Sequence, residues 1–450
     1  MHFLRNVLGV AGIAFAVATN AHASSASLNA RGLKEDYVRA PLPPGFQVVN
    51  TELEGPVFAD AQGRTLYKWP KKQMRNGDAG EVEEKPTCDN HIYRETGGYM
   101  SPYPAGLELP EVESRPSCVD VWPPVLASAD AKPIGKWKIV TRLDGRKQWA
   151  YGGWSLYTSI MDKKPGDVLG GSAMFHHGES AAQRHPVGPE PNVPPQFEIN
   201  TTMFGRLAVL HEGWSIYTYE GDGRNKSNCA GACLDGWAPI IAAEYARPVG
   251  EWTTFERALG VRQWAFRGMP VYRHLTDPKI NSLDGGDIPR WHNVYTQMAP
   301  EPPKGFTLKD TAVGVVLGDS DGRTVYQYVC DDDAPDQLAC DHPNAPQAYR
   351  FAICGGGDPD RCVKTFPYMI APVGAKSGNT IWGTMYIDPK TGKKADADKP
   401  GALNVWAFRG RPVYTYVVDK KTYEMNAQDW GEFNGQRNGF RALVYRLVFG

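Results

Sequence analysis

The 450-residue sequence lacks several features that mark common classes of protein. Its formal net charge is only −1, whereas nucleic-acid-binding proteins carry a clear basic excess, so we expect no nucleic-acid partner. Long amphipathic helical patterns are missing. The one long apolar run, at residues 7–18, is too short to predict a membrane span.

Sequence motifs of well-known catalytic sites are also missing. We find no GxSxG, HExxH, CxxCH, GxGxxG or P-loop pattern, and therefore expect no cofactor. No CxxC pair is present, which disfavours a cysteine metal site. A hydrolase that uses two carboxylates from separate strands leaves no spaced motif, so this kind of enzyme stays open.

The N-terminus has the organisation of a secretory signal peptide. Arg5 precedes the apolar run, and small residues follow it up to Ala23. We expect residues 1–23 to be removed, leaving a secreted or periplasmic protein that does not span the membrane. Residues 24–40 would then form a leader. No Cys lies near the cleavage site, which argues against a lipid anchor.

Aromatic and turn-forming residues are abundant. The chain has 13 Trp, 21 Tyr, 48 Gly and 36 Pro, a composition that is typical of a turn-rich, all-β protein.

A short pattern is repeated along the chain. WAFRGMPVY at 264–272 returns as WAFRGRPVY at 406–414, and WAYGGWSLY at 149–157 is a looser copy. Each copy has a Gly, then an aliphatic residue directly before a Tyr, as expected for a turn that leads into a strand. Aligned on this Tyr, the copies lie at Tyr67, Tyr157, Tyr217, Tyr272, Tyr326 and Tyr414.

The copies alternate in type. Every second copy carries a Trp eight residues before its Tyr, so the true repeat is a pair of hairpins. Pro-rich stretches begin each pair and suit short stiff linkers. We therefore predict an all-β fold of three tandem modules with six hairpin repeats, at residues 41–185, 192–299 and 300–450.

Eight cysteines in an exported chain favour disulfides that staple the loops. One pair falls in module one, one in module two and four cysteines in module three, where three pairings are open. The cysteines expected to form disulfides are Cys88, Cys118, Cys229, Cys233, Cys330, Cys340, Cys354 and Cys362.

The pattern Tyr-x-aromatic-x-x-Asp resembles that of the bacterial secreted-repeat family with a Yx(F/W/Y)xxD motif, whose function is unknown. The resemblance implies export and fold type and supplies no reaction. The motif fails at the first copy, where Lys72 replaces Asp, and is partial at the second and fourth. The full matches are Tyr217, Tyr219, Asp222; Tyr326, Tyr328, Asp331; and Tyr414, Tyr416, Asp419.

These motif residues have two interpretations. In the first, which we favour, Tyr packs in a sheet and Asp bonds a turn or a Tyr hydroxyl of a neighbouring strand. In the second, aromatic rows with carboxylates form a ligand-binding face, and the nine residues of the full matches are its candidates.

Two further stretches contain residue types that bind metal ions. His176, His177 and His185 could bind copper or zinc, but the alignment places them at the end of a strand. The acidic run at 331–336 lacks the order of a calcium loop. We predict no metal site at either.

The sequence predicts a secreted, non-catalytic binding or cell-envelope protein that uses aromatic faces and the insertions at 73–117 and 331–361. Its ligand is unknown, with polysaccharide or another envelope component as candidates. The alternatives are an exported hydrolase or oxidoreductase acting on a polymer, and an accessory protein of a periplasmic redox or metal system. Whether the protein is an enzyme is left open.

Overall fold

The computed structural model describes residues 32–74, 77–92, 94–95, 106, 108, 113, 116–170, 184–311, 314–328, 354, 358–427 and 440–447. In this part of the chain almost all regular structure is strand, and the strands pair antiparallel. The prediction of an all-β fold built from antiparallel hairpins is confirmed. Within the same residues, no helix is long and apolar enough to cross a membrane.

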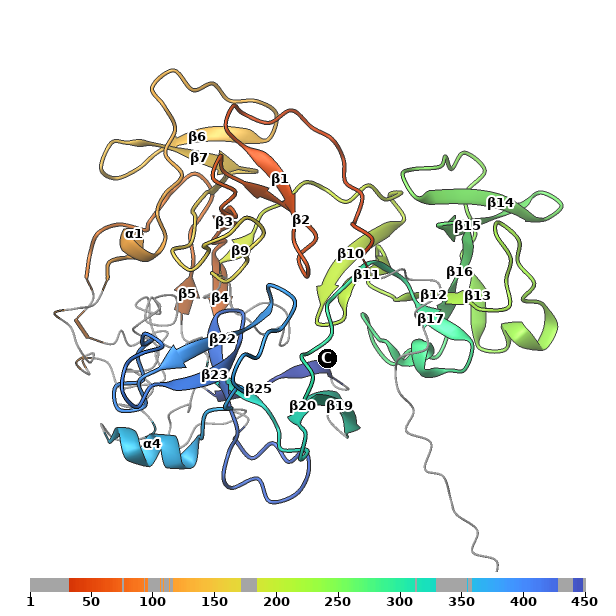
Figure 1. Cartoon of the computed structure of the whole chain (residues 1–450). Coiled ribbons are helices and arrows are strands. Elements are labelled where there is room, and N and C mark those ends of the chain that lie inside the picture. Colours follow the sequence, from red (N-terminus) through yellow and green to blue (C-terminus); the bar gives the residue numbers. More distant parts are fainter. Residues whose placement is uncertain are drawn as a thin grey trace, which may run out of the picture.

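We describe the chain in three segments, 45–191, 194–299 and 303–447, because the order of elements recurs in them (Figure 1). The first contains β1 Gln47–Asn50, β2 Pro56–Ala59, β3 Tyr67–Lys68, β4 Lys72–Met74, β5 Gly77–Ala79, α1 Cys118–Val121, β6 Trp137–Thr141, β7 Lys147–Tyr151, β8 Trp154–Ser155 and β9 His185–Pro186.

The second segment contains β10 Phe197–Thr202, β11 Gly205–Leu210, β12 Ile216–Tyr219, the 3-10 helix η3 Gly231–Leu234, β13 Trp237–Pro239, β14 Trp252–Ala258, β15 Val261–Phe266, β16 Met269–His274, the 3-10 helix η4 Asp284–Asp287, β17 Trp291–Asn293 and β18 Tyr295–Met298. The third contains β19 Phe306–Thr311, β20 Gly314–Asp319, β21 Tyr326–Tyr328, α4 Pro359–Thr365, β22 Trp382–Ile387, β23 Leu403–Phe408, β24 Arg411–Tyr414, β25 Phe440–Ala442 and β26 Val444–Leu447.

The main sheets of the second and third segments have the same strand order. It is β14-β15-β16-β12-β17 in one and β22-β23-β24-β21-β25 in the other. At the centre of each sheet the two repeat tyrosines face each other across neighbouring strands: Tyr217 opposite Tyr272, and Tyr326 opposite Tyr414. The first segment repeats this with a bridge between Tyr67 and Tyr157.

Each of these strands separates two cores. The aliphatic residue before a repeat tyrosine lies in one hydrophobic cluster, and the tyrosine lies in another. In the second segment Ile216 and Val271 pack on one side, while Tyr217 and Tyr272 pack on the other. This follows from the alternation of side chains along a strand.

The aliphatic side of each sheet is closed by three aromatic rings. Phe197, from β10, stacks on Trp252 with ring centroids 4.2 Å apart and meets Trp264 edge-on at 5.7 Å. Phe46 with Trp137 and Trp149, and Phe306 with Trp382 and Trp406, repeat this group. The Trp that marks every second hairpin copy is therefore part of a core.

The repeated Gly forms the turn before each strand. All six such glycines have positive φ, a conformation in which a Cβ would be strained. Before Gly268 and Gly410 stand Arg267 and Arg409, which also have positive φ, so both central turn residues are left-handed.

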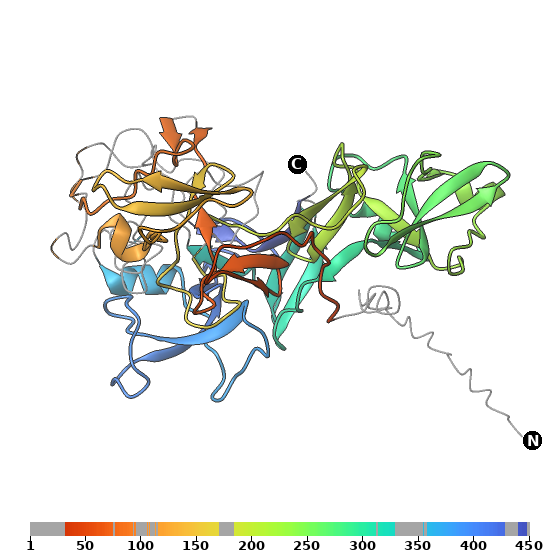
Figure 2. The same cartoon turned by 90° about the horizontal axis from the view of Figure 1, so that it is seen from above.

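The first and third segments pack together, and the second stands to one side (Figures 1 and 2). Arg409 of the third segment pairs with Glu54 of the first. Glu35, which precedes the first segment, is buried and accepts two hydrogen bonds of 3.0 Å from Arg206 of the second segment. One hydrophobic cluster also contains Leu53, Met203 and residues of the third segment.

Candidate functional site: the tyrosine–carboxylate clusters

The repeat tyrosines donate hydrogen bonds to carboxylates of the opposite hairpin. In the second segment Tyr217 donates to Asp277 at 2.8 Å, and Tyr272 donates to Asp222 at 2.6 Å. The two bonds therefore cross between the copies. In the same way Tyr67 donates to Asp162 at 2.8 Å and Tyr326 to Asp419 at 2.7 Å.

The Asp of the motif also holds the loop that follows it. The second oxygen of Asp222 accepts the backbone N–H groups of Asn228 and Cys229, at 2.7 and 3.2 Å. Asp162 accepts from Leu169 and Asp419 from Asn426, at 2.8 and 3.0 Å. One carboxylate thus joins a loop to a tyrosine of the neighbouring hairpin.

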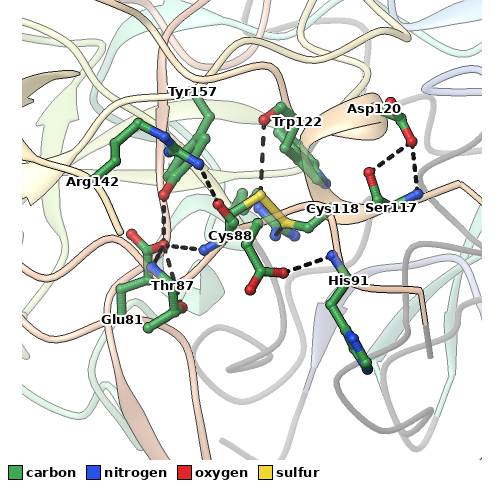
Figure 3. The surroundings of a disulfide bond; sticks show 12 residues. Glu81, Thr87, Cys88, His91, Ser117, Cys118, Asp120, Trp122, Arg142 and Tyr157 are labelled. Carbon is green, nitrogen blue, oxygen red and sulfur yellow. Dashed lines mark hydrogen bonds between the residues drawn. A yellow bond between two sulfur atoms is a disulfide. The ribbon is translucent and has the colours of Figure 1, made fainter. Parts of the chain in front are cut away.

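The first hairpin lacks the motif Asp, and a different residue takes over its role. Glu81, which is buried, accepts the hydroxyl of Tyr157 at 2.6 Å and the N–H groups of Thr87 and Cys88 at 2.7 and 3.2 Å (Figure 3). Glu81 thus accepts the same set of donors as Asp222, although all three reach its Oε1, whereas Asp222 divides them between its two oxygens. Glu81 lies nine residues after Lys72, the motif position, so the alignment could not identify it.

The aromatic residue of the motif belongs to a stack of flat groups. In the second segment Tyr219 packs on Trp291 at 4.9 Å, and Trp291 stacks on Trp237 at 3.5 Å with the rings 4° from parallel. His274 covers the far face of Trp237 at 4.5 Å. In the third segment Phe440, Phe366 and Tyr416 form the stack, and Tyr328 meets Phe440 edge-on.

The first segment builds this stack with a cation. The guanidinium of Arg184 lies 4.2 Å from the ring of Trp69 and 4.5 Å from that of Trp122. Arg184 thus replaces Trp291 of the second segment: Arg184 directly precedes His185, which lies opposite Lys68, as Trp291 directly precedes His292, which lies opposite Thr218. A planar guanidinium can stack on aromatic faces as a ring does.

Burial changes the ionisation of these groups. It raises the pKa of Asp162 to about 7, and it also raises the pKa values of Asp222, Asp277 and Asp419. Burial likewise raises the pKa of Tyr272 to about 12. The phenols therefore stay protonated and act as donors.

The predicted binding residues fall into two groups. Tyr217, Tyr326 and Tyr414 have no exposed surface, and Tyr328 is buried as well. Their rings are enclosed, as in the architectural interpretation. Tyr219, Tyr416 and Asp222 are half-buried, and Asp419 is 9% exposed. Asp331 lies outside the described residues.

Three disulfides are present in the described part of the chain: Cys88–Cys118, Cys229–Cys233 and Cys354–Cys362. The first joins the Glu81 loop to α1 (Figure 3). Cys330 and Cys340 lie outside the described residues, as do His176, His177 and the acidic run at 331–336. His185 lies in β9 opposite Lys68.

A shallow groove lies between the first and third segments. Its polar side chains are already engaged, since Glu54 pairs with Arg409 and Glu52 accepts the hydroxyl of Thr380 at 2.7 Å. No group of three or more His, Cys, Asp or Glu among the described residues could hold a metal ion.

Comparison with known proteins identifies one stretch of the chain. Residues 138–173 match the family model of a secreted repeat of unknown function. The secreted-repeat match contains one hairpin copy with its Tyr157 and Asp162, and so confirms the family resemblance that the motifs indicated. No curated protein and no solved structure matches the chain.

Proposed function

We propose that the protein is a secreted, non-catalytic binding protein of the cell envelope. The observation that carries this proposal is the contrast between the repeat tyrosines, which are enclosed and bonded, and the apolar side chains left on the surface. Tyr245 is 88% exposed, Leu259 97% and Leu143 83%, and Val373 is fully exposed.

These exposed side chains recur at corresponding places. Leu126, Ile241 and Ile370 each lie opposite the strand that carries the marker Trp, and all are partly exposed. Leu143 and Leu259 follow the equivalent strands β6 and β14. Exposed apolar side chains at three equivalent positions suit a ligand with a repeating structure, because several linked weak contacts together give high avidity. Polysaccharides and other envelope polymers are ligands of this kind.

The proposal includes export by the segment 1–23, which lies outside the described residues, and division into the modules 41–185, 192–299 and 300–450. Sequencing of the protein recovered from the culture or periplasm should begin at Ser24. Limited proteolysis should cut between modules before it cuts within them.

A sedimentation assay with peptidoglycan and insoluble polysaccharides tests the binding role. We expect retention of the full mature chain on at least one polymer, and reduced retention of Leu259→Ser combined with Tyr245→Ser. Ser substitutions at Leu33 and Val38, which are partly exposed outside the repeats, are the matched control. Failure of the mature protein to bind any of the polymers would contradict the proposal.

A further inference from the structure

The second segment contains a hydrogen-bonded chain that its counterparts lack. His274 stands where the first segment has Ser159 and the third has Tyr416. Its Nδ1 lies 3.0 Å from Oδ1 of Asp277, whose Oδ2 accepts the hydroxyl of Tyr217 at 2.8 Å. The phenol, carboxylate and imidazole are thus connected in one line.

This chain runs from the core toward the surface. Tyr217 has no exposed surface and the Asp277 side chain has none, while the His274 side chain is 12% exposed. Nε2 of His274 lies 3.1 Å from the hydroxyl of Thr276, an exposed residue. A phenol proton therefore has an acceptor at hydrogen-bond distance, and a titratable base stands behind that acceptor.

The ring of Tyr217 also joins a continuous path of aromatic contacts. Its centroid lies 5.2 Å from that of Trp237, which stacks on Trp291 at 3.5 Å. Trp291 contacts Tyr219 at 4.9 Å, and Tyr219 is half-buried at the outer end. Tyrosine and tryptophan are the side chains most readily oxidised by one electron, so the contacts connect Tyr217 electronically to the surface.

We propose that this cluster is a redox site at which a one-electron oxidant, such as a radical or a high-potential metal complex, converts Tyr217 to a neutral tyrosyl radical. The electron leaves through Trp237, Trp291 and Tyr219 to the oxidant. The O–H bond of Tyr217 breaks and its proton binds Oδ2 of Asp277. The products are the tyrosyl radical, a neutral carboxyl group and the reduced oxidant, so charge and atoms balance.

The surroundings require the proton and the electron to leave together. Burial and the charge of Asp277 raise the pKa of Tyr217, so its phenolate is not available beforehand. A buried phenol radical cation without an acceptor would carry the high cost of an unpaired charge. His274 is a positioning residue that holds the carboxylate in line with the phenol. This site is independent of the proposed binding role.

Flash oxidation of the full mature chain by a photogenerated ruthenium(III) polypyridyl complex, followed by electron paramagnetic resonance, tests the proposal. The background variant is Tyr245→Phe, because that exposed tyrosine would otherwise be oxidised directly. Tyr217→Phe should remove most of the long-lived tyrosyl signal. The matched control Tyr326→Phe, which breaks the same type of Tyr–Asp bond in the third segment, should leave it unchanged. Equal signals in the two variants would overturn the proposal.

Two further variants report on the proton. Asp277→Asn should slow radical formation about 100-fold, a usual contribution of a positioned proton acceptor. In the unmodified protein the rate should fall in acid, because protonated Asp277 cannot accept; Tyr217, His274 and Asp284 are the titratable groups that face it. His274→Ser copies the residue of the first segment and should slow the reaction several-fold and shift this pH profile. If Tyr217→Phe or Asp277→Asn does not fold, an unchanged rate and profile in His274→Ser overturns the proposal.

Discussion

The first and second segments form the same stack from different chemical groups. In the second, Trp291 lies between Tyr219 and Trp237; in the first, Arg184 lies between Trp69 and Trp122. A neutral ring and a charged guanidinium share a flat shape and a polarisable face. The middle of the stack therefore requires a planar side chain, which can be either apolar or charged.

The carboxylates of the two segments support the same conclusion. Asp222 and Glu81 each accept one tyrosine hydroxyl and two backbone N–H groups, although only Asp222 stands at the motif position. What both segments share is an acceptor at one point in space. The residue that supplies it can come from another place in the chain.

Truncation of the middle side chain of this stack should cause the largest loss of stability. Trp291→Ala should cost about 3–5 kcal/mol, as expected for a large buried ring. Urea unfolding of the mature chain measures this loss. Arg184→Phe should keep most of the stability, while Arg184→Ala should not. If Phe is as harmful as Ala at this position, charge and not planarity decides the first stack.

The disulfides of the same two segments close loops of different length. Cys88–Cys118 spans 30 residues, but Cys229–Cys233 spans only four. From the loop entropy of the unfolded chain, replacement of both cysteines by Ser should cost about 3.6 kcal/mol in the first and about 1.9 kcal/mol in the second. Denaturant unfolding of both double variants checks this, and a larger loss in the second would show that its bridge does more than close a loop.

The buried Asp162 should make stability depend on pH. Burial raises its pKa from 3.8 to about 7, so the folded protein holds a proton that the unfolded chain has lost. Its contribution is complete below pH 3.8, is lost as the pH rises to about 7, and is on the order of 4 kcal/mol.

Thermal unfolding between pH 4 and 8 should therefore show a weaker decline with rising pH in Asp162→Asn than in the unmodified protein. Asp144→Asn is the opposite case. Hydrogen bonds from Arg146 lower the pKa of Asp144 below 3.8, so its contribution to stability is lost only below that pH, and Asp144→Asn should lower stability by the same amount from pH 4 to 8. Parallel pH curves for Asp162→Asn and the unmodified chain would contradict the prediction.

Substitutions in the turn of the repeated hairpin should have the smallest effect on stability. Arg267 has positive φ and binds Glu251 through two hydrogen bonds, whereas the first segment has Gly152 opposite Lys136. Gly152→Arg should cost about 1 kcal/mol, the strain of a left-handed residue. Because Lys136 pairs with Glu190, Lys136→Glu alone is the reference: it should cost less in the Gly152→Arg background than by itself, and additive effects in the double variant would show that no ion pair forms between the two new side chains.

Several features of the site followed from residue order. The alternation of Ile216 and Tyr217 predicted two faces, and the position of Gly268 predicted a turn. The preferred interpretation of the motif named the type of bond, a hydrogen bond between an Asp and a tyrosine hydroxyl of a neighbouring strand. It did not name the partners, which cross between hairpins that lie far apart in the chain.

Glu81, Arg184 and His274 could not be assigned from the pattern. Glu81 and Arg184 lie outside the aligned copies of the motif. His274 occupies the aromatic position of the fourth copy, where it only made the match to the motif partial. Their roles depend on which groups are nearby in space: two backbone N–H groups, two indole rings, and a carboxylate that already holds a phenol.

The sequence by itself determined the strands, their turns and the two faces of each, because side-chain alternation and the φ of glycine are local properties. Only the tertiary structure decided which tyrosine binds which carboxylate and which groups form each stack. Such contacts join distant parts of the chain, and any planar group or acceptor that reaches the same point satisfies them equally well.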